Sequence, residues 1–348
     1  MSHISTNSQP IILGVETACD DCAIAIARGP EIVTHKVVTE SLMHQKYGGI
    51  VPELAARQQL AFIDRLYLEV LEEAGIAPDD IDFVAVNNKH GLIRSVSVGV
   101  AFANGVAAGL GKPLISVHHV EAHLMSPEIG SDALIEPSLC LAVAGGHNLL
   151  VDIEAFGKYR IIGRTVDDCA GEAFDKVAIE LGLGFPGGPL IDALSKTGRR
   201  DAFAFPRPMI HEKGLNFSFS GLKTAVRFMV QKMKPEEVKA QQADLAASFQ
   251  GAIVDVLVAK SRQALIETGR KRLTAAGGVA ANSELRDALA TMCADIGVSF
   301  VPAPRTYCGD NAAMVAYAAG LLLRSDRAET GYWDATPSAV LGEYRERY

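Results

Sequence analysis

The pattern of apolar and polar positions alternates between short apolar runs and longer stretches with helical spacing. Apolar runs predict strands at 11–15, 23–27, 81–86 and 114–117. Between them, helical spacing predicts a helix at 53–75 and a second, rich in small residues, at 98–110. The first third of the chain is therefore predicted to be an α/β unit whose first turn, at 16–21, is acidic.

The second half of the chain repeats this theme. Strands are predicted at 138–143, 149–153 and 273–276, and helices at 171–181, 241–268, 283–296 and 311–323. Two such halves are typical of a duplicated α/β architecture with a cleft between its lobes. We expect lobes at 11–135 and 136–325, the second with a basic helical insertion at about 190–240. The segments 1–10 and 326–348 are expected to be tails, the first one disordered.

Composition narrows the class of protein. A chain of 348 residues is long enough for two lobes. Its apolar stretches are interrupted by glycine or charge before they reach about 18 residues, so we expect no transmembrane helix. We expect a cytoplasmic protein. Its six cysteines include a Cys19-x-x-Cys22 spacing, for which reduced cysteines are the simpler interpretation. With a net charge of −8, RNA binding would need a local basic face or a partner that supplies one.

Three histidines fall within six residues, in the run His118-His119-Val120-Glu121-Ala122-His123. On a helix, His119 and His123 lie four positions apart, so both imidazoles project from one face at a metal-chelating spacing. A zincin peptidase has its glutamate directly after the first histidine, whereas Glu121 points to another side. The alternative is a helix start with surface histidines. We favour a metal site.

Two histidines do not complete a metal site, and Asp310 is the best candidate for a further ligand. It lies at a turn directly before the last predicted helix. A mixed nitrogen and oxygen set suits iron, zinc or manganese. The same position is typical of a helix N-cap, and spacing alone leaves both roles open.

Paired glycines follow two predicted strands, at 143–147 and 277–282, and a third pair lies at 185–189. Backbone N–H groups at such turns bind phosphate, and the absent side chains let a nucleotide lie close. Paired-glycine turns are common singly, but together these three favour a nucleotide cleft.

Two charged clusters are further candidates. Glu16, Asp20 and Asp21 in the first turn could bind a metal, act as a base or position an amine, or could be a solvated hairpin tip. The second cluster begins at Lys196-Thr197-Gly198-Arg199-Arg200 and has phenylalanines at 203, 205, 217 and 219. Basic and aromatic residues together suit a nucleic-acid surface; the alternative is core phenylalanines beside solvated charges.

In this order, the motifs resemble the tRNA N6-adenosine threonylcarbamoyltransferase family (TsaD, formerly Gcp or O-sialoglycoprotein endopeptidase). The likeness extends from Ile12 to about Leu323. The motifs that carry it, besides the histidine run, are Gly14-Val15-Glu16-Thr17-Ala18-Cys19-Asp20-Asp21, His44-Gln45-Lys46-Tyr47-Gly48-Gly49-Ile50-Val51-Pro52-Glu53, Ala144-Gly145-Gly146-His147, Ala170-Gly171-Glu172-Ala173-Phe174-Asp175-Lys176, Phe217-Ser218-Phe219-Ser220-Gly221-Leu222-Lys223-Thr224, Gly277-Gly278-Val279-Ala280-Ala281-Asn282 and Cys308-Gly309-Asp310-Asn311-Ala312.

The resemblance implies a fold of the actin/sugar-kinase/heat-shock-chaperone (ASKHA) type, with two ribonuclease-H-like lobes around a nucleotide cleft. It implies one divalent metal ion, usually iron or zinc and here expected to be iron, on His119, His123 and Asp310. It also implies an acyltransferase that moves threonylcarbamoyl from threonylcarbamoyl-AMP to the exocyclic amine of the tRNA adenosine next to the anticodon. Asp20 and Asp21, with Glu16 beside them, would be catalytic. The residues implied to bind the adenylate are Val143, Ala144, Gly145, Gly146, His147, Asp175, Gly188, Asp192 and Asn282. The implied protein partners are a dimerising paralogue and a small ATPase of the same pathway.

Several positions depart from the family pattern. The family's Ala-Gly-Pro-Gly-Leu run after the strand that ends at Val86 is replaced by Asn87-Asn88-Lys89-His90-Gly91-Leu92. Ala144 stands for serine, Asn148 for threonine, Ala18 for serine and Asp21 for glutamate. The metal and adenylate positions are kept, so the departures bear on the acceptor substrate more than on the fold.

Two other functions fit parts of this pattern. A carbamoyltransferase-type paralogue would keep the metal and adenylate motifs and take another acceptor. A non-catalytic scaffolding paralogue usually lacks the metal histidines, so His119, His123 and Asp310 argue against it. The old peptidase name is a poor third, because Glu121 is misplaced for that chemistry.

Overall fold

The computed structural model describes residues 9–39, 43–44, 47, 49–339 and 341. The chain divides into two units: Met1–Glu40, Val51–Leu134 and Asp310–Leu341 form the first, and Ser41–Ile50, Ile135–Gly309 and Gly342–Tyr348 the second. The sequence-based division placed 310–325 in the second lobe, whereas its contacts place it in the first unit. Of the two expected tails, 1–8, 340 and 342–348 lie outside the described residues.

The first unit is built on a five-stranded sheet. Its strands are β1 (Ile11–Glu16), β2 (Asp21–Arg28), β3 (Glu31–Thr39), β4 (Phe83–Lys89) and β5 (Leu114–His118), in the order β3-β2-β1-β4-β5. β1 pairs antiparallel with β2 and parallel with β4, and β4 pairs parallel with β5. The four predicted strands are confirmed. β3 was not predicted, because it is an edge strand with mixed polar and apolar residues.

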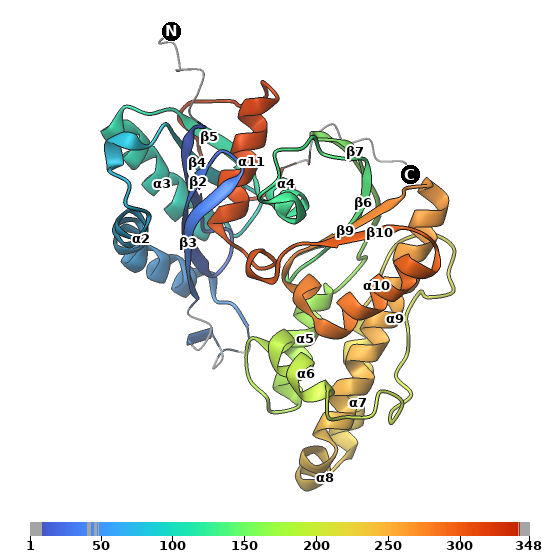
Figure 1. Ribbon diagram of the computed structural model, residues 1–348. Helices are drawn as coiled ribbons and strands as arrows, with labels where there is room; N and C mark the ends of the chain where they lie inside the picture. The colour runs from blue at the N-terminus through green and yellow to red at the C-terminus, as the bar shows by residue number, and fades with distance from the viewer. Residues whose placement is uncertain (1–8, 40–42, 45–46, 48, 340, 342–348) are drawn as a thin grey trace. The chain divides into compact units, whose positions relative to one another are not determined.

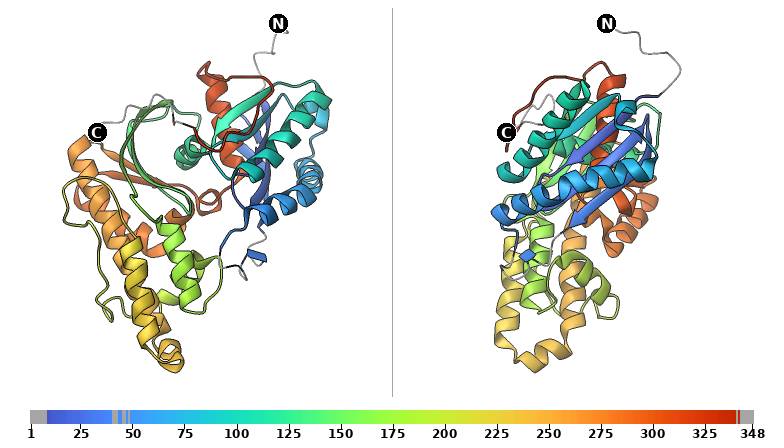
Figure 2. Two further views of the ribbon diagram at one scale, coloured as in Figure 1. Left: turned by 180° about the vertical axis from the view of Figure 1, so that it is seen from behind. Right: turned by 90° about the vertical axis from the view of Figure 1, so that its left-hand side faces the viewer.

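Helices cover both faces of this sheet (Figures 1 and 2). α2 (Pro52–Ala74) and α3 (Ile93–Leu110) lie on one face, and α11 (Ala312–Arg324) lies on the other. The short α4 (His119–Met125) follows β5 directly, and two 3-10 turns complete the unit at Pro78–Asp80 and Ser126–Glu128. Burial on both faces explains why the central strands are almost wholly apolar.

Among the described residues, α3 is the one helix that is long and apolar enough to cross a membrane, by length and composition alone. The sequence predicted none, because glycines interrupt this stretch. α3 joins β4 to β5, which are parallel neighbours in one sheet. Val96, Val100 and Ala103 are buried in the core of the unit. α3 is therefore the crossover helix of a β-α-β unit.

The second unit repeats the topology of the first. Its strands are β6 (Ser138–Val143), β7 (Asn148–Ala155), β8 (Lys158–Arg164), β9 (Arg272–Ala276) and β10 (Ser299–Pro302), in the order β10-β9-β6-β7-β8. An antiparallel β6-β7-β8 meander is joined through the parallel β6–β9 and β9–β10 pairs, as β1-β2-β3 is joined to β4 and β5. The duplicated ribonuclease-H-like architecture expected from the sequence is confirmed.

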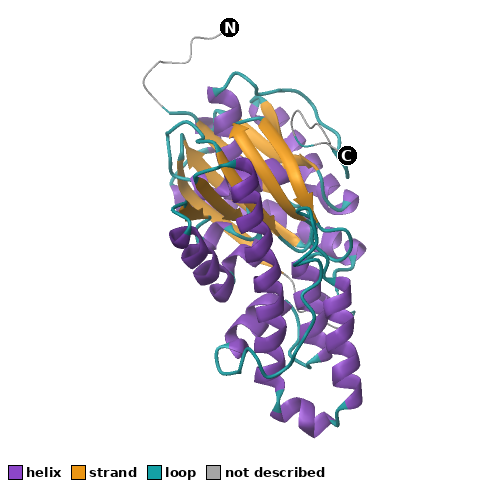
Figure 3. Ribbon diagram, turned by 90° about the vertical axis from the view of Figure 1, so that its right-hand side faces the viewer, coloured by secondary structure: helices purple, strands orange, loops and turns teal. Residues whose placement is uncertain are grey.

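The helices of the second unit are visible beside its strands in Figure 3. They are α5 (Ala170–Glu180), α6 (Gly187–Ser195), α7 (Ser220–Lys232), α8 (Pro235–Ala240), α9 (Gln242–Thr268) and α10 (Ser283–Asp295), with 3-10 turns at Gly278–Ala281 and Arg305–Tyr307. Most of α9 is buried, and its Phe249 meets Phe174 of α5 edge to face. The region expected to be a helical insertion contains the end of α6 and all of α7 and α8.

The segment after α11, expected to be a tail, runs along the edge of the first sheet as far as residue 339. Thr330 bridges to Ile115 of β5, and Thr336 bridges to Lys89 of β4. The indole N–H of Trp333 donates to the carbonyl of Leu114 at 3.1 Å. We call residues 329–339 the C-terminal strap. Its backbone pairs with a sheet edge that would otherwise present unpaired groups.

Candidate functional site

The histidine run lies where β5 passes into α4. His118 ends the strand, and His119 and His123 lie one turn apart on α4, all of whose residues are buried. The two rings are perpendicular, with centroids 4.7 Å apart. The run is thus helical and inside the first unit, which excludes the interpretation of a surface helix start.

Asp310 completes this group from the start of α11. Its Oδ1 lies 3.0 Å from Nε2 of His123 and 3.6 Å from Nε2 of His119. The N-cap of α11 is the next residue, Asn311, whose side chain accepts from the backbone N–H of Met314 at 2.9 Å. The capping role that the sequence left open for Asp310 is therefore filled by its neighbour, and Asp310 faces the histidines.

The donor set fits a divalent metal ion. One ligand atom from each of His119, His123 and Asp310 lies within 4.8 Å of the others. Ligands at zinc-type bond lengths in a tetrahedron are about 3.3 Å apart, and the two distances to Asp310 lie on either side of that value. Two imidazole nitrogens and one carboxylate oxygen suit iron, zinc or manganese.

The carboxylate of Glu16 stands behind the first histidine. It ends β1, has no exposed surface, and places Oε2 3.3 Å from Nδ1 of His119. Burial lowers the pKa of His119, but the charges of Asp310 and Glu16 outweigh it and raise that pKa to about 9. The site therefore has a strongly negative potential that attracts a cation.

The acidic turn also meets this group. Burial, followed by the charges of Asp310 and Asp20, raises the pKa of Asp21 to about 8. The hydroxyl of Thr39 donates to Asp21 at 2.5 Å. Asp20, Asp21 and Asp310 thus lie within electrostatic reach of one another, and a cation would relieve their repulsion. The sequence grouped Glu16 with these aspartates, whereas the structure places its carboxylate against His119.

The two thiols of the Cys19-x-x-Cys22 spacing have raised pKa values, which favours the interpretation of reduced cysteines. Neither cysteine forms a disulfide. Burial raises the pKa of Cys22 to about 12, and burial together with Asp20 and Asp310 raises the pKa of Cys19. A raised pKa keeps a thiol protonated at neutral pH, and a protonated thiol is a poor nucleophile.

The residues expected to bind the adenylate all belong to the second unit. Val143 ends β6, and the turn that follows it closes through a hydrogen bond from the Ala144 N–H to the carbonyl of His147 at 2.9 Å. At Gly145 and Gly146 a side chain would meet no atom within 4 Å, so there is open space over this turn. The start of α5 packs against its other side, where a Cβ on Gly171 would lie 2.8 Å from the carbonyl oxygen of Ala144.

Two of the remaining adenylate candidates, Asp175 and Asp192, accept hydrogen bonds from the first residues of other helices. Asp175 accepts from the N–H of Gly187 at 2.7 Å, at the start of α6. There is open space at the next residue, Gly188. Asp192 accepts from the N–H and the hydroxyl of Ser283 through one oxygen, Oδ1.

The side chain of Asn282 is already bound within the protein. Its oxygen caps α10 through the N–H of Leu285 at 2.9 Å, and its nitrogen donates to Gln250 at 2.6 Å. Gln250 in turn donates to Glu284 at 2.9 Å. These partners were not identified from the sequence, although an asparagine directly before a predicted helix is itself an N-cap signal.

The nucleic-acid interpretation of the basic and aromatic segment is wrong for three of its four phenylalanines. Phe205, Phe217 and Phe219 are at most 5% exposed and belong to the core of the second unit. Arg199 pairs with Asp244, while Arg200 and Arg207 both pair with Asp255. These three rings are not available for base stacking, and these arginines are engaged with carboxylates. Phe203 is partly buried and stacks on Phe205.

The loop that departs from the family pattern lies against the C-terminal strap. The N–H of His90 donates to the carbonyl of Thr336, and the N–H of Thr336 donates to the carbonyl of Asn88. The His90 ring stacks on that of His118 at 6.0 Å, and Nζ of Lys89 lies 5.6 Å from the Trp333 ring centre. The bulky residues that replace the glycine–proline turn thus hold the strap.

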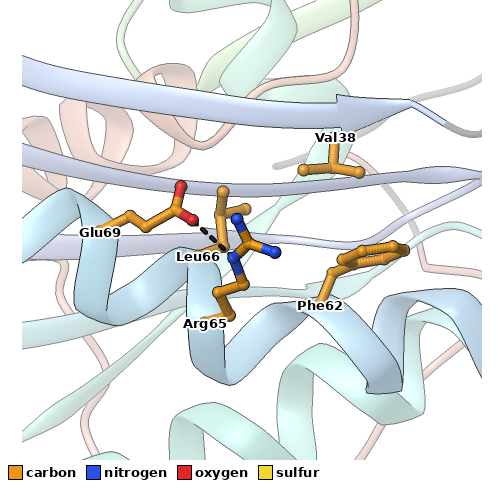
Figure 4. Close-up of a pocket in the computed structure, with 5 residues that line it drawn as sticks. All are labelled: Val38, Phe62, Arg65, Leu66 and Glu69. Atoms are coloured by element: carbon orange, nitrogen blue, oxygen red, sulfur yellow. Dashed lines mark hydrogen bonds and ion pairs between the residues drawn. The ribbon is translucent and has the colours of Figure 1, made fainter.

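Figure 4 shows a hollow between β3 and α2 in the first unit. The residues that line it are Val38, Phe62, Arg65, Leu66 and Glu69. Arg65 donates to Glu69 there at 2.7 Å. None of the predicted site residues lines this hollow, and it has no part in the site.

Comparison with known proteins gives a consistent result. The family model described as tRNA N6-adenosine threonylcarbamoyltransferase matches residues 31–317. A protein of that name from Verminephrobacter eiseniae is 43% identical over 326 residues, covering 92% of this chain and 94% of the relative. One from Magnetococcus marinus is 44% identical over 350 residues, covering 97% and 99%.

Solved structures share the fold at low identity. Full-length HypF in a phosphate- and nucleotide-bound form has a TM-score of 0.60 and 13% identity over 93% of this chain, which spans about half (48%) of HypF. The activator of 2-hydroxyisocaproyl-CoA dehydratase from Clostridium difficile, with bound ADPNP, has a TM-score of 0.54 and 13% identity, covering 91% of this chain and 97% of that one. These likenesses support an ASKHA-type fold.

Proposed function

The chain belongs to the tRNA N6-adenosine threonylcarbamoyltransferase family, and we propose on that basis that it transfers threonylcarbamoyl from threonylcarbamoyl-AMP to the exocyclic amine of the tRNA adenosine next to the anticodon. One observation carries the proposal beyond the family name. Asn311 caps α11, so Asp310 is left to face the buried pair of histidines, at 3.0 Å from Nε2 of His123 and 3.6 Å from Nε2 of His119. A paralogue without catalysis has no need of such a donor set.

We propose that His119, His123 and Asp310 hold one divalent ion, with iron as the first choice and zinc as the second. Such an ion supplies Lewis-acid polarisation to a bound carbonyl oxygen. The adenosine amine nitrogen forms a bond to the carbonyl carbon, and the bond from that carbon to the phosphate oxygen breaks, so AMP leaves with the electron pair. The amine proton needs an acceptor, and Asp20 and Asp21 are carboxylates within the electrostatic reach of Asp310.

The adenylate is proposed to bind in the second unit, on the turn from Val143 to His147 and near Asp175, Gly188, Asp192 and Asn282. The open space over Gly145, Gly146 and Gly188 supports this assignment. Since the Asn282 side chain caps α10 and binds Gln250, its expected contact is through the backbone. Oδ2 of Asp192, the oxygen not used by Ser283, is the proposed acceptor from a ribose hydroxyl.

The net charge of the chain bears on whether it needs protein partners to bind tRNA. The chain has a net charge of −8, and arginines of its basic segment pair with carboxylates. Binding of tRNA is therefore proposed to be assisted by positive charge from a partner. We propose that a dimerising paralogue and a small ATPase of the same pathway assist the enzyme, and that it acts in the cytoplasm.

The test is a reconstituted reaction. Purified protein is incubated with threonylcarbamoyl-AMP, Fe²⁺ or Zn²⁺ and unmodified tRNA, with and without the two partners, and the nucleosides are analysed by liquid chromatography and mass spectrometry. We expect threonylcarbamoyladenosine, and its loss in His119→Ala and Asp310→Asn. His211→Ala, at an exposed histidine of the second unit, is the matched control and should keep activity. The absence of product with competent partners would refute the proposal, as would full activity of His119→Ala.

A further inference from the structure

We propose that Asn87 and Glu16 act in series as positioning residues for the metal centre, with Asn87 orienting Glu16 and Glu16 orienting His119. This inference rests on the metal-assisted function proposed above and concerns the same site. It assigns to the first residue of the divergent loop a role in the metal centre. Sequence reasoning had treated that loop as separate from the metal ligands.

Glu16 is a buried carboxylate held by three groups. It has no exposed surface. Its Oε1 accepts from the N–H of Ala18 at 2.5 Å and from Nδ2 of Asn87 at 3.3 Å, and its Oε2 lies 3.3 Å from Nδ1 of His119. A buried carboxylate is costly unless its oxygens are hydrogen-bonded. Because two donors fix Oε1, the direction of Oε2 toward His119 is fixed as well.

Glu16 selects the tautomer of His119. A carboxylate facing Nδ1 favours the form in which Nδ1 carries the proton and donates it to Oε2. The lone pair then lies on Nε2, the nitrogen that faces Asp310 at 3.6 Å. Glu16 therefore presents the coordinating nitrogen toward the other two ligands and holds the ring in place.

Asn87 is itself oriented by its own loop. It is wholly buried in β4, and its Oδ1 accepts from the N–H of Lys89 at 3.3 Å. The β4–β5 register shifts between Asn87 and Lys89, which brings that N–H within reach. With Oδ1 engaged by a donor, Nδ2 is the end of the amide that faces Glu16. The loop that holds the C-terminal strap is thus joined to the metal centre by two hydrogen bonds in series.

The neighbouring asparagine provides a matched control. Asn88 is 2% exposed, and its amide donates to the carbonyl of Asp334 at 3.2 Å and accepts from the hydroxyl of Ser116 at 2.6 Å. Neither of these hydrogen bonds reaches Glu16. Replacing either asparagine removes a buried amide from the same strand, but only Asn87 contacts the metal-centre carboxylate.

The experiment is a titration of metal-free protein with Co²⁺, followed by visible absorption, on wild type, Glu16→Gln, Asn87→Ala, Asn87→Asp and Asn88→Ala. Outer partners of metal ligands are worth about 10–100-fold in affinity. We expect losses in that range for Glu16→Gln and Asn87→Ala, with altered absorption bands. Asn87→Asp, which sets a second carboxylate against Glu16, should lose as much or more. Asn88→Ala should stay within about threefold of wild type, since its change leaves the outer partners of the ligands intact.

Thermal unfolding of each metal-free variant separates misfolding from repositioning. If Asn87→Ala does not fold, Asn87→Ser, which keeps a shorter donor, replaces it and should show an intermediate affinity. Affinity in Asn87→Ala equal to that of Asn88→Ala would overturn the proposal even if wild type transfers threonylcarbamoyl. Weakened Co²⁺ binding in Asn87→Ala and Glu16→Gln, with no transfer by wild type, would leave this inference standing and reject the function. Failure of wild type to bind Co²⁺ would reject both.

Discussion

The packing of α11 on β1 offers a direct test of how the metal centre is held. Gly14 lies in β1 beneath the first turns of α11. A methyl group there would lie 2.5 Å from the carbonyl oxygen of Ala312 and 2.9 Å from Cβ of Ala316. Both neighbours belong to the helix itself, so Gly14→Ala forces the helix to move.

The size of the effect follows from the overlap. An ordinary contact between carbon and oxygen is about 3.3–3.6 Å, so the start of the helix must shift by about 1 Å. Overpacking of this kind costs about 1–3 kcal/mol, which lowers the melting temperature of a unit of this size by roughly 2–10 °C. Asp310 lies two residues before Ala312 and would move with it. A site that must be held to within about 0.5 Å should then lose metal affinity, and we expect at least about tenfold.

Scanning calorimetry with and without metal, together with a Co²⁺ titration, measures both effects. Gly320→Ala is the matched control at the same helix–sheet interface. Its methyl group would meet the nearest atoms at 3.6 Å, an ordinary contact, and alanine in a helix interior is favoured by about 1 kcal/mol over glycine. Gly320→Ala should therefore be slightly stabilised, with metal affinity unchanged. A Gly14→Ala protein with unaltered melting temperature and affinity would refute the reasoning.

Three further predictions concern stability. Removal of the metal with a chelator should lower the melting temperature of the first unit, because saturation at 100 times Kd contributes about 2.7 kcal/mol; an unchanged calorimetric trace would count against a bound ion. Asp167→Asn removes the carboxylate that accepts from the N–H and hydroxyl of Ser220 at the start of α7, and should cost about 1 kcal/mol at pH 7. Burial raises the pKa of Asp167, but hydrogen bonds from Ser218, Ser220 and the N–H of Phe219 outweigh it and lower the pKa. The stabilisation that these hydrogen bonds give is present above the unfolded pKa of about 3.9, and it disappears as the pH falls through the folded pKa of Asp167. The free energies of unfolding of Asp167→Asn and wild type should therefore converge in acid. Lys260→Met should cost about 1–3 kcal/mol in denaturant unfolding, because the buried ammonium donates to the carbonyls of both Glu212 and Gly214; equal midpoints would show that these carbonyls find other donors.

Much of the fold was predictable because most of the strands are buried on both faces. The strands that the sequence identified include every central strand of both sheets. The three that it did not identify, β3, β8 and β10, are all edge strands. An edge strand is partly exposed and mixes polar with apolar residues, so it lacks the continuous apolar run that identified its neighbours.

The candidate site was predictable only where its geometry is local. The four-residue spacing of His119 and His123 is enough to place them together once a helix forms. Asp310 could not be distinguished from an N-cap by spacing, and the structure shows that Asn311 fills that role. Glu16 and His119 are 103 positions apart, and no local pattern indicates that they meet.

The three proposed metal ligands lie in one structural unit, although His123 and Asp310 are 187 positions apart in the sequence. Glu16 ends β1, the two histidines lie on α4 directly after β5, and Asp310 lies two residues before α11. α11 follows the whole second unit in the chain, yet it packs on β1 at Gly14. The first unit is therefore complete only with α11 packed on its sheet, and the same packing places Asp310 beside the histidines. The residues proposed to bind the adenylate all lie in the second unit. Each of the two proposed sites, for the metal ion and for the adenylate, is therefore built from residues of a single unit.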